Sequence, residues 1–197
     1  MFPAARMLAA AVLLTTLTAC GGSDTPPAYK MTGDACAATD TADLAALTGD
    51  TSAKGQAEQL KPGLTGGACK WTFDGGKGYV MLNTFIAIHP SAEAAKKMHD
   101  DFRVSDAKAD ASSEDKTVTD VKELGTTAYL YREHDDKSPW KPVDQWPYKF
   151  GVQHGTLTLT VLANGYAREA VGWPSKEQEL QDKVKATASG IMKKLAG

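Results

Sequence analysis

The clearest pattern in the chain is an alternation of apolar and polar residues over 148–153 and again over 156–161. A period of two is typical of strands that bury one face. His154 and Gly155 lie between the two runs and supply a turn. The pattern therefore predicts an antiparallel hairpin with apolar side chains inside and threonines in water. The threonines expected in water are Thr156, Thr158 and Thr160.

Other stretches predict further strands and helices by the same criteria. Strands are expected at 69–73, 79–88, 118–122 and 126–132. Helices are expected at 42–47, at 91–102 and from Ser175 to about 195, the last with the apolar stripe Leu180, Val184, Ala188, Ile191 and Leu195. The polar stretches 50–66 and 104–117 are expected to be surface loops. Consecutive hairpins with few helices predict an α+β fold, a mainly antiparallel sheet of about six strands with three helices packed on it.

The first 20 residues have the pattern of an export signal. Arg6 precedes an apolar run over 7–19, which is shorter than the roughly 20 residues of a membrane-spanning helix. Leu17-Thr18-Ala19-Cys20 resembles the bacterial lipobox, in which the cysteine receives a diacylglyceryl group and the preceding peptide bond is then cut. The resemblance covers these four positions and implies a membrane anchor through lipid on Cys20. An ordinary secretory signal, with Cys20 as an incidental thiol, is the alternative.

This signal divides the chain into three expected parts. Residues 1–19 are the signal peptide, 20–33 are the lipidated cysteine and a flexible tether, and 34–197 are a single α+β domain. The formal net charge is −2 at pH 7. So mild a balance argues against a nucleic-acid partner. We therefore expect a protein that is anchored by its lipid at the extracytoplasmic face of the cell membrane.

Cys36 and Cys69 are the two cysteines that remain after Cys20. An even pair in an oxidising compartment predicts a disulfide, worth about 3–4 kcal/mol for a loop of this length. Two buried thiols are the alternative. Two isolated cysteines lack the clustered spacing of a zinc site, so no metal is expected. Trp71 should share a strand face with Cys69, where its ring would cover the disulfide.

Four short sequence features occur in a definite order along the chain. They are Cys36 before a short helix, the Cys69-Lys70-Trp71 strand, the segment 123–129 and a terminal helix after a hairpin. Over about residues 34–195 the chain resembles a family of actinobacterial cell-envelope lipoproteins that carry a domain of unknown function. Thr126-Thr127 stands where that family usually has Gly-Asp or Gly-Glu. The resemblance implies export, the disulfide and a PsbP-like sheet-and-helix architecture, but no activity and no catalytic residues.

The loop 133–146 carries the side chains best suited to contact a ligand. Exposed tryptophans between prolines supply a large contact area for a glycan, a peptide or a small ligand. The candidate contacts are His134, Asp135, Asp136, Trp140 and Trp146. The aspartates could instead hold Ca²⁺ weakly, although their spacing does not fit an EF-hand. The interpretation that we favour is a solvated loop with Trp146 packed back on the sheet.

Catalytic motifs are missing from the sequence. It has no G-x-S-x-G elbow and no phosphate loop, and its four histidines fall in four different elements. His99, beside Asp100 and Asp101, is expected on a polar helix face. We therefore expect no cofactor, no metal and no enzymatic activity, but non-enzymatic binding of an unknown ligand or envelope protein. An accessory or structural role in the envelope is the alternative, and an unrecognised hydrolase is the third.

Overall fold

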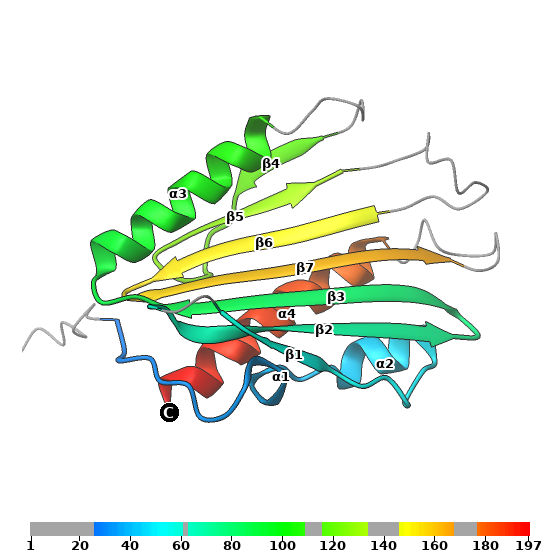
Figure 1. Ribbon diagram of the computed structural model, residues 1–197. Helices are drawn as coiled ribbons and strands as arrows, with labels where there is room; N and C mark the ends of the chain where they lie inside the picture. The colour runs from blue at the N-terminus through cyan, green and yellow to red at the C-terminus, as the bar shows by residue number, and fades with distance from the viewer. Residues whose placement is uncertain (1–25, 61–62, 109–115, 134–145, 168–176) are drawn as a thin grey trace, which may run out of the picture.

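The computed structural model of the chain describes residues 26–60, 63–108, 116–133, 146–167 and 177–197. Within these residues the strands form one open sheet of seven antiparallel strands in the order β1-β2-β3-β7-β6-β5-β4 (Figure 1). The strands are β1 (Gln56–Gln59), β2 (Thr65–Gly75), β3 (Gly78–Ile88), β4 (Thr117–Asp120), β5 (Thr127–Arg132), β6 (Trp146–His154) and β7 (Leu157–Ala167).

Helices pack on both faces of this sheet. In the described residues they are α1 (Ala35–Ala38), α2 (Ala42–Thr48), α3 (Ala92–Lys108) and α4 (Glu177–Ala196). α1, α2 and α4 cover one face, and α3 lies on the other, where it contacts β4, β6 and β7 (Figure 1). The predicted α+β class, an antiparallel sheet with helices packed on it, is confirmed.

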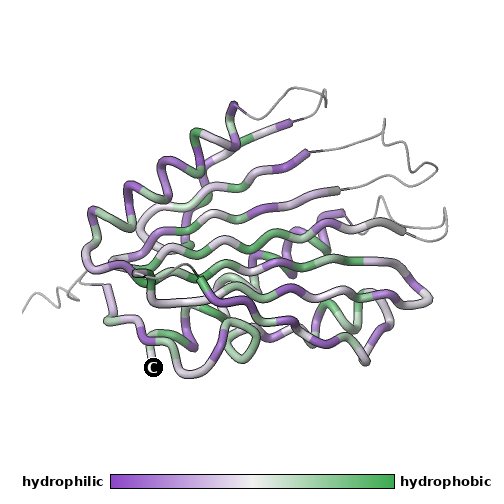
Figure 2. The backbone as a smooth tube through the Cα atoms, in the orientation of Figure 1, coloured by the Kyte–Doolittle hydropathy of each residue, from purple (hydrophilic) through white to green (hydrophobic). Residues whose placement is uncertain are grey.

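The hydrophobic core lies between the sheet and the layer of α1, α2 and α4. Every second residue of the central strands points into this layer, as the alternation predicts. Large core side chains include Phe73, Leu82, Tyr148, Phe150, Leu157, Leu159 and Ile191. The predicted stripe of α4 is buried throughout, from Leu180 to Leu195. Most of α3 is hydrophilic by contrast, as Figure 2 shows.

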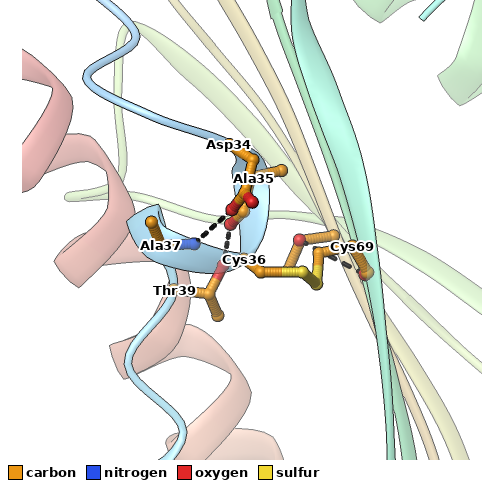
Figure 3. The surroundings of a disulfide bond; sticks show 7 residues. Asp34, Ala35, Cys36, Ala37, Thr39 and Cys69 are labelled. Carbon is orange, nitrogen blue, oxygen red and sulfur yellow. Dashed lines mark hydrogen bonds between the residues drawn. A yellow bond between two sulfur atoms is a disulfide. The ribbon is translucent and has the colours of Figure 1, made fainter. Parts of the chain in front are cut away.

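The predicted disulfide between Cys36 and Cys69 is confirmed (Figure 3). It ties α1 to β2, with the two Cα atoms 5.1 Å apart. α1 is four residues long, and the side chain of Asp34 caps it by accepting a hydrogen bond from the N–H of Ala37 at 2.8 Å. Trp71 is buried on the same face of β2 as Cys69, as expected from their spacing of two. The bond therefore fixes the start of the domain to β2, the second strand of the sheet.

Several elements differ from their predicted limits. β1 lies inside the predicted surface loop 50–66; its four residues are exposed, so an edge strand there gives no hydrophobic signal. β2 begins at Thr65 rather than at Cys69. α3 continues to Lys108 through residues that we expected in the loop 104–117, because an exposed helical turn tolerates small and charged side chains. α1 was not predicted, because four residues are too few to show a helical period.

The prediction that the threonines of the last hairpin face water is wrong for Thr158. This side chain is buried under α3, where its hydroxyl donates a hydrogen bond to the carbonyl of Ala95 at 3.2 Å. The prediction of a polar helix face at His99 is also wrong. His99 is buried, with its ring edge-on to Tyr129 at 5.3 Å between centroids. Both errors have one cause: α3 covers a sheet face that the alternation assigns to water.

The described end of the expected tether packs on the domain. Tyr29 is buried in the core, and the N–H of Lys30 donates to the carbonyl of Leu195 at 3.0 Å. The expected signal peptide and Cys20 fall in residues 1–25, outside the described residues. Among the helices that the structure describes, none combines the length and apolar character that a membrane span requires.

Candidate binding face of the sheet

α3 covers only part of its side of the sheet. It contacts β4, β6 and β7, and it reaches β3 through Phe102, whose ring lies edge-on to that of Phe85 with the centroids 6.0 Å apart. The helices α1 and α2, which contact β2, lie on the opposite face. Figure 1 shows this arrangement, with α3 beside β4 and β5 and at a distance from β2. We call the middle of the uncovered region the open face; the next row of the same sheet face, with Asp74 and Tyr79, lies beyond it. The open face consists of Lys70 and Thr72 from β2, Met81 and Asn83 from β3, and Leu162 and Asn164 from β7.

The residues of the open face form two adjacent rows across three strands. In the first row Lys70 is paired with Asn83, which is paired with Leu162. In the second row Thr72 is paired with Met81, which is paired with Asn164. Because neighbouring strands lie about 4.8 Å apart, each row spans roughly 10 Å. The Oδ1 of Asn164 is buried. The ammonium of Lys70, the hydroxyl of Thr72 and the amide of Asn83, beside two apolar side chains, suit a polar ligand that has one apolar side, such as a sugar ring.

A pocket of about 360 Å³ adjoins the open face beside β1. Its lining includes Lys70 and Thr72, so the pocket and the open face are continuous. The remaining lining residues are Asp50, Ser52, Ala53, Lys54 and Gln56. Lys54 and Lys70 bring two ammonium groups to a pocket large enough for a small ligand. This lining favours an anionic or hydroxyl-rich group.

Asp50 fixes the loop that forms one wall of the pocket. Its Oδ1 accepts hydrogen bonds from the backbone N–H of Ser52 at 2.8 Å and from the Ser52 hydroxyl at 2.7 Å. Its Oδ2 accepts from the N–H of Asp74 at 2.9 Å. These hydrogen bonds, the one from Asp74 first, lower the pKa of Asp50. The carboxylate therefore stays ionised and fixes the loop, so the pocket lining carries two ammonium groups and one carboxylate.

A second pocket, of about 510 Å³, lies between the connection of α1 to α2 and residues 50–53. Its lining is mostly alanine and threonine, with Phe73 among the apolar residues. This lining has no lysine or arginine. It therefore offers less specific chemistry than the pocket beside the open face.

Lys149 marks the border between the open face and α3. It is paired with Leu162 and so continues the first row, but its Nζ lies 2.5 Å from Oδ1 of Asp106 on α3. The hydroxyl of Tyr129 donates to the other oxygen of Asp106 at 2.6 Å. Burial, and then this hydrogen bond, raises the pKa of Tyr129, so the hydroxyl remains a donor. The side chains of Lys149, Tyr129 and Asp106 therefore form a hydrogen-bonded group. This group marks the point at which the first row passes under α3.

The ligand contacts expected in the loop 133–146 fall largely outside the described residues. His134, Asp135, Asp136 and Trp140 all lie there, so the expectation for them stays a prediction. Trp146 is the first residue of β6, where its backbone is paired with Gly165. The structure therefore locates the two ends of this loop, at β5 and β6, on the same end of the sheet.

The sequence contained a weak signal for the open face. The alternation over 69–73 placed Lys70 and Thr72 on the face opposite to Cys69, and the structure agrees. Asn83 and Asn164 carried no such signal, because their role depends on strand order. β3 and β7 are far apart in the sequence but adjacent in the sheet. Only the pairing of these two strands brings the amides together.

The described histidines belong to three different segments of the fold. His89 follows β3, His99 is on α3 and His154 ends β6. Burial lowers the pKa of His89 and of His154. Among the residues that the structure describes, no group of three or more His, Cys, Asp and Glu side chains is arranged to hold a metal ion.

The fold and the open face define an α+β domain with one covered and one half-covered sheet face. No protein-family model matches the chain, and no curated protein matches it. Among solved structures, the extracellular domain of PknH from Mycobacterium tuberculosis is similar, with a TM-score of 0.40 and 12% sequence identity. The match covers 81% of this chain and 93% of that chain. At this level the similarity is weak.

Proposed function

We propose that this chain is an exported, lipid-anchored, non-enzymatic protein that binds a polar ligand of the cell envelope through the open face and its pocket. The observation that carries the proposal is the continuity of two polar rows with a pocket that holds Lys54 and Lys70. Ammonium groups bind anionic groups, and the amide of Asn83 donates and accepts hydrogen bonds with hydroxyls. The ligand class that fits is a glycan that carries carboxylate or phosphate groups.

Two observations support export. The apolar run before Cys20 has the length and the small final residues of a lipoprotein signal. The bond between Cys36 and Cys69 is typical of proteins that fold in an oxidising compartment. Since lipid on Cys20 would hold the domain at the outer side of the membrane, components of the envelope are the ligands it would meet.

The chemistry of the open face favours binding over catalysis. Its polar side chains are those of Lys70, Thr72, Asn83 and Asn164, and the Oδ1 of Asn164 is buried. Amides do not titrate and so cannot serve as general acids or bases. These groups hold a ligand well but have little means of moving its protons.

The test is mass spectrometry of small molecules and glycans that co-purify with the detergent-extracted protein. Lys54→Ala combined with Lys70→Ala should remove the bound material, because it removes both ammonium groups of the pocket. The matched control is Lys96→Ala combined with Lys97→Ala, two lysines of α3 whose side chains are 61% and 76% exposed. The control protein should retain the ligand. Equal retention by both variants would contradict the proposed site.

The same experiment distinguishes ligand binding from the alternative, an accessory or structural role in the envelope. If the domain serves to dock onto another envelope protein, a protein partner should co-purify in similar amounts with both variants and the unchanged chain. No small molecule or glycan should then depend on Lys54 and Lys70. Circular dichroism of each variant, with an unchanged melting temperature, establishes that the fold is intact.

A further inference from the structure

The point at which the N-terminal segment joins the domain is fixed by two contacts. The buried ring of Tyr29 carries a hydroxyl that is hydrogen-bonded to Nδ1 of His154, the last residue of β6. The N–H of Lys30 donates to the carbonyl of Leu195, in the last turn of α4. The segment therefore enters the domain at the end that holds the β6–β7 turn and the end of α4. We call this the entry end.

The distance from the entry end to Cys20 is limited by the chain itself. Pro26 lies against the β6–β7 turn, because a Cβ built on Gly155 would be 2.7 Å from the Pro26 Cβ. From Cys20 to Pro26 the chain has few residues, and even a fully extended backbone would span only about 20 Å. A lipid on Cys20 would therefore keep the entry end close to the bilayer surface.

The entry end carries exposed lysines beside α4, together with the exposed carboxylates of Glu93 and, in the β4–β5 turn, Glu123. Lys30 is exposed next to the last turn of α4, which itself presents the exposed residues Lys193 and Lys194. Nζ of Lys194 donates to the carbonyl of Ala37 at 2.5 Å, which holds this lysine near the surface of the domain. Lysines close to a lipid headgroup layer are attracted by anionic lipids. Glu93, in the first turn of α3, is an exposed carboxylate on the same end of the sheet.

We propose that the entry end is a docking surface for an anionic bilayer, with Lys30 and Lys193 toward the headgroups; this rests on the proposed lipidation of Cys20. The strands then run away from the membrane. The β2–β3 turn at Gly76 is about 33 Å further out, because the eleven residues of β3 rise roughly 3.3 Å each. The open face, which lies along β2, β3 and β7, would then be roughly perpendicular to the membrane surface and would not contact it.

The experiment uses the full lipoprotein in vesicles with a nitroxide-bearing headgroup lipid as a short-range quencher. A fluorophore is attached through Glu93→Cys in one protein and through Gly76→Cys in another. Each introduced thiol is unique, since Cys36 and Cys69 are bonded and Cys20 would be acylated. Gly76 tolerates the change, because a Cβ there meets nothing within 4 Å. Quenching at position 93 should be at least about threefold stronger, given the length of β3.

Charge reversal tests the lysines. In phosphatidylglycerol vesicles the Lys30→Glu, Lys193→Glu protein should show a smaller difference between the two labels, because repulsion of the entry end by the headgroups then opposes the short connection. The control, Lys77→Glu with Lys108→Glu, reverses charges at the β2–β3 turn and at the end of α3 and should keep the difference. An unchanged difference in the first variant would overturn the role of the lysines.

Flotation of the vesicles separates the two proposals. A protein that floats with the vesicles but is quenched equally at both labels, or more strongly at position 76, keeps its anchor and overturns the docking surface. A protein that fails to float overturns the lipid anchor, and the docking surface with it. A third variant, with a long Gly-Ser insertion after Gly22, should float and yet lose the quenching difference, because the short connection is removed.

Discussion

The hydroxyl of Tyr29 is hydrogen-bonded to Nδ1 of His154, a residue 125 positions further along the chain. The two rings also meet edge-on, with their centroids 5.8 Å apart. This contact joins the N-terminal segment at Tyr29 to the last hairpin of the sheet. Part of the segment that the sequence predicts to be a flexible tether therefore belongs to the folded domain.

The first prediction concerns the pH dependence of stability. Burial holds the pKa of His154 in the folded protein below its ordinary value of 6.5. At this residue the unfolded chain therefore binds a proton more readily than the folded protein. The free energy of unfolding should be at its highest above about pH 7 and should fall as the pH drops below 6.5. His154→Gln should reduce this slope in urea titrations at pH 7.5, 6.5 and 5.5. His89, whose pKa burial also lowers, should contribute to the remaining slope. A slope unchanged by the substitution would contradict the role of His154.

Tyr29→Phe isolates the hydroxyl of the same contact. The ring stays buried, so only one hydrogen bond is lost, and the free energy of unfolding should fall by about 1 kcal/mol. Tyr29→Ala also removes the buried ring and should cost about 3 kcal/mol or more. Thermal unfolding of the three proteins measures both steps. Equal stability of the alanine variant and the unchanged chain would show that this segment is not part of the folded unit.

Gly55 is predicted to be intolerant of any side chain. A Cβ at this position would fall 2.8 Å from the sulfur atoms of Cys36 and Cys69 and from the Trp71 ring. Neither the disulfide nor the buried ring can move cheaply, so Gly55→Ala should destabilise the fold by about 1–3 kcal/mol. The control is Gly76→Ala, where a Cβ meets nothing. Similar melting temperatures for the two variants would refute the close packing around the disulfide.

Asp106 is predicted to be the most costly carboxylate on α3 to remove. Asp106→Ala leaves the half-buried ammonium of Lys149 and the hydroxyl of Tyr129 without their shared acceptor, at a cost of about 2 kcal/mol. The control is Asp101→Ala on the same helix, whose pair with Lys97 is exposed and should contribute less than about 0.5 kcal/mol. Urea unfolding of both variants is the measurement, and a larger loss for the control would contradict this assignment.

Trp140→Ala tests the expectation from the sequence that the loop 133–146 contacts a ligand. The melting temperature should stay nearly unchanged, while the amount of co-purified ligand should fall, because an exposed tryptophan adds contact area without supporting the core. A large drop in melting temperature would instead assign Trp140 to the core.

The elements with one clear period could be predicted from the sequence. Leu180, Val184 and Leu195 repeat at helical spacing, and the alternation over 148–153 and 156–161 gave the last hairpin. These predictions depend on a single buried face, which is a local property of the chain. The disulfide followed from the number of cysteines and the expected compartment, without any geometry.

The parts that could not be predicted depend on contacts between distant segments. Thr158 and His99 are polar residues that became buried because α3 folds onto the second sheet face. β1 has no apolar residue pattern and exists because the backbone of β2 offers it a partner. The open face arises from the order β2-β3-β7, and no local pattern in the sequence contains that order.

The mass of the N-terminal peptide of the protein extracted from its native membrane tests the central claim most directly. The account predicts a peptide that begins at Cys20 and carries a diacylglyceryl thioether, from a chain in which Cys36 and Cys69 are joined. A peptide that begins at Met1, with an unmodified thiol at Cys20, would contradict both the lipid anchor and the docking of the entry end on the membrane.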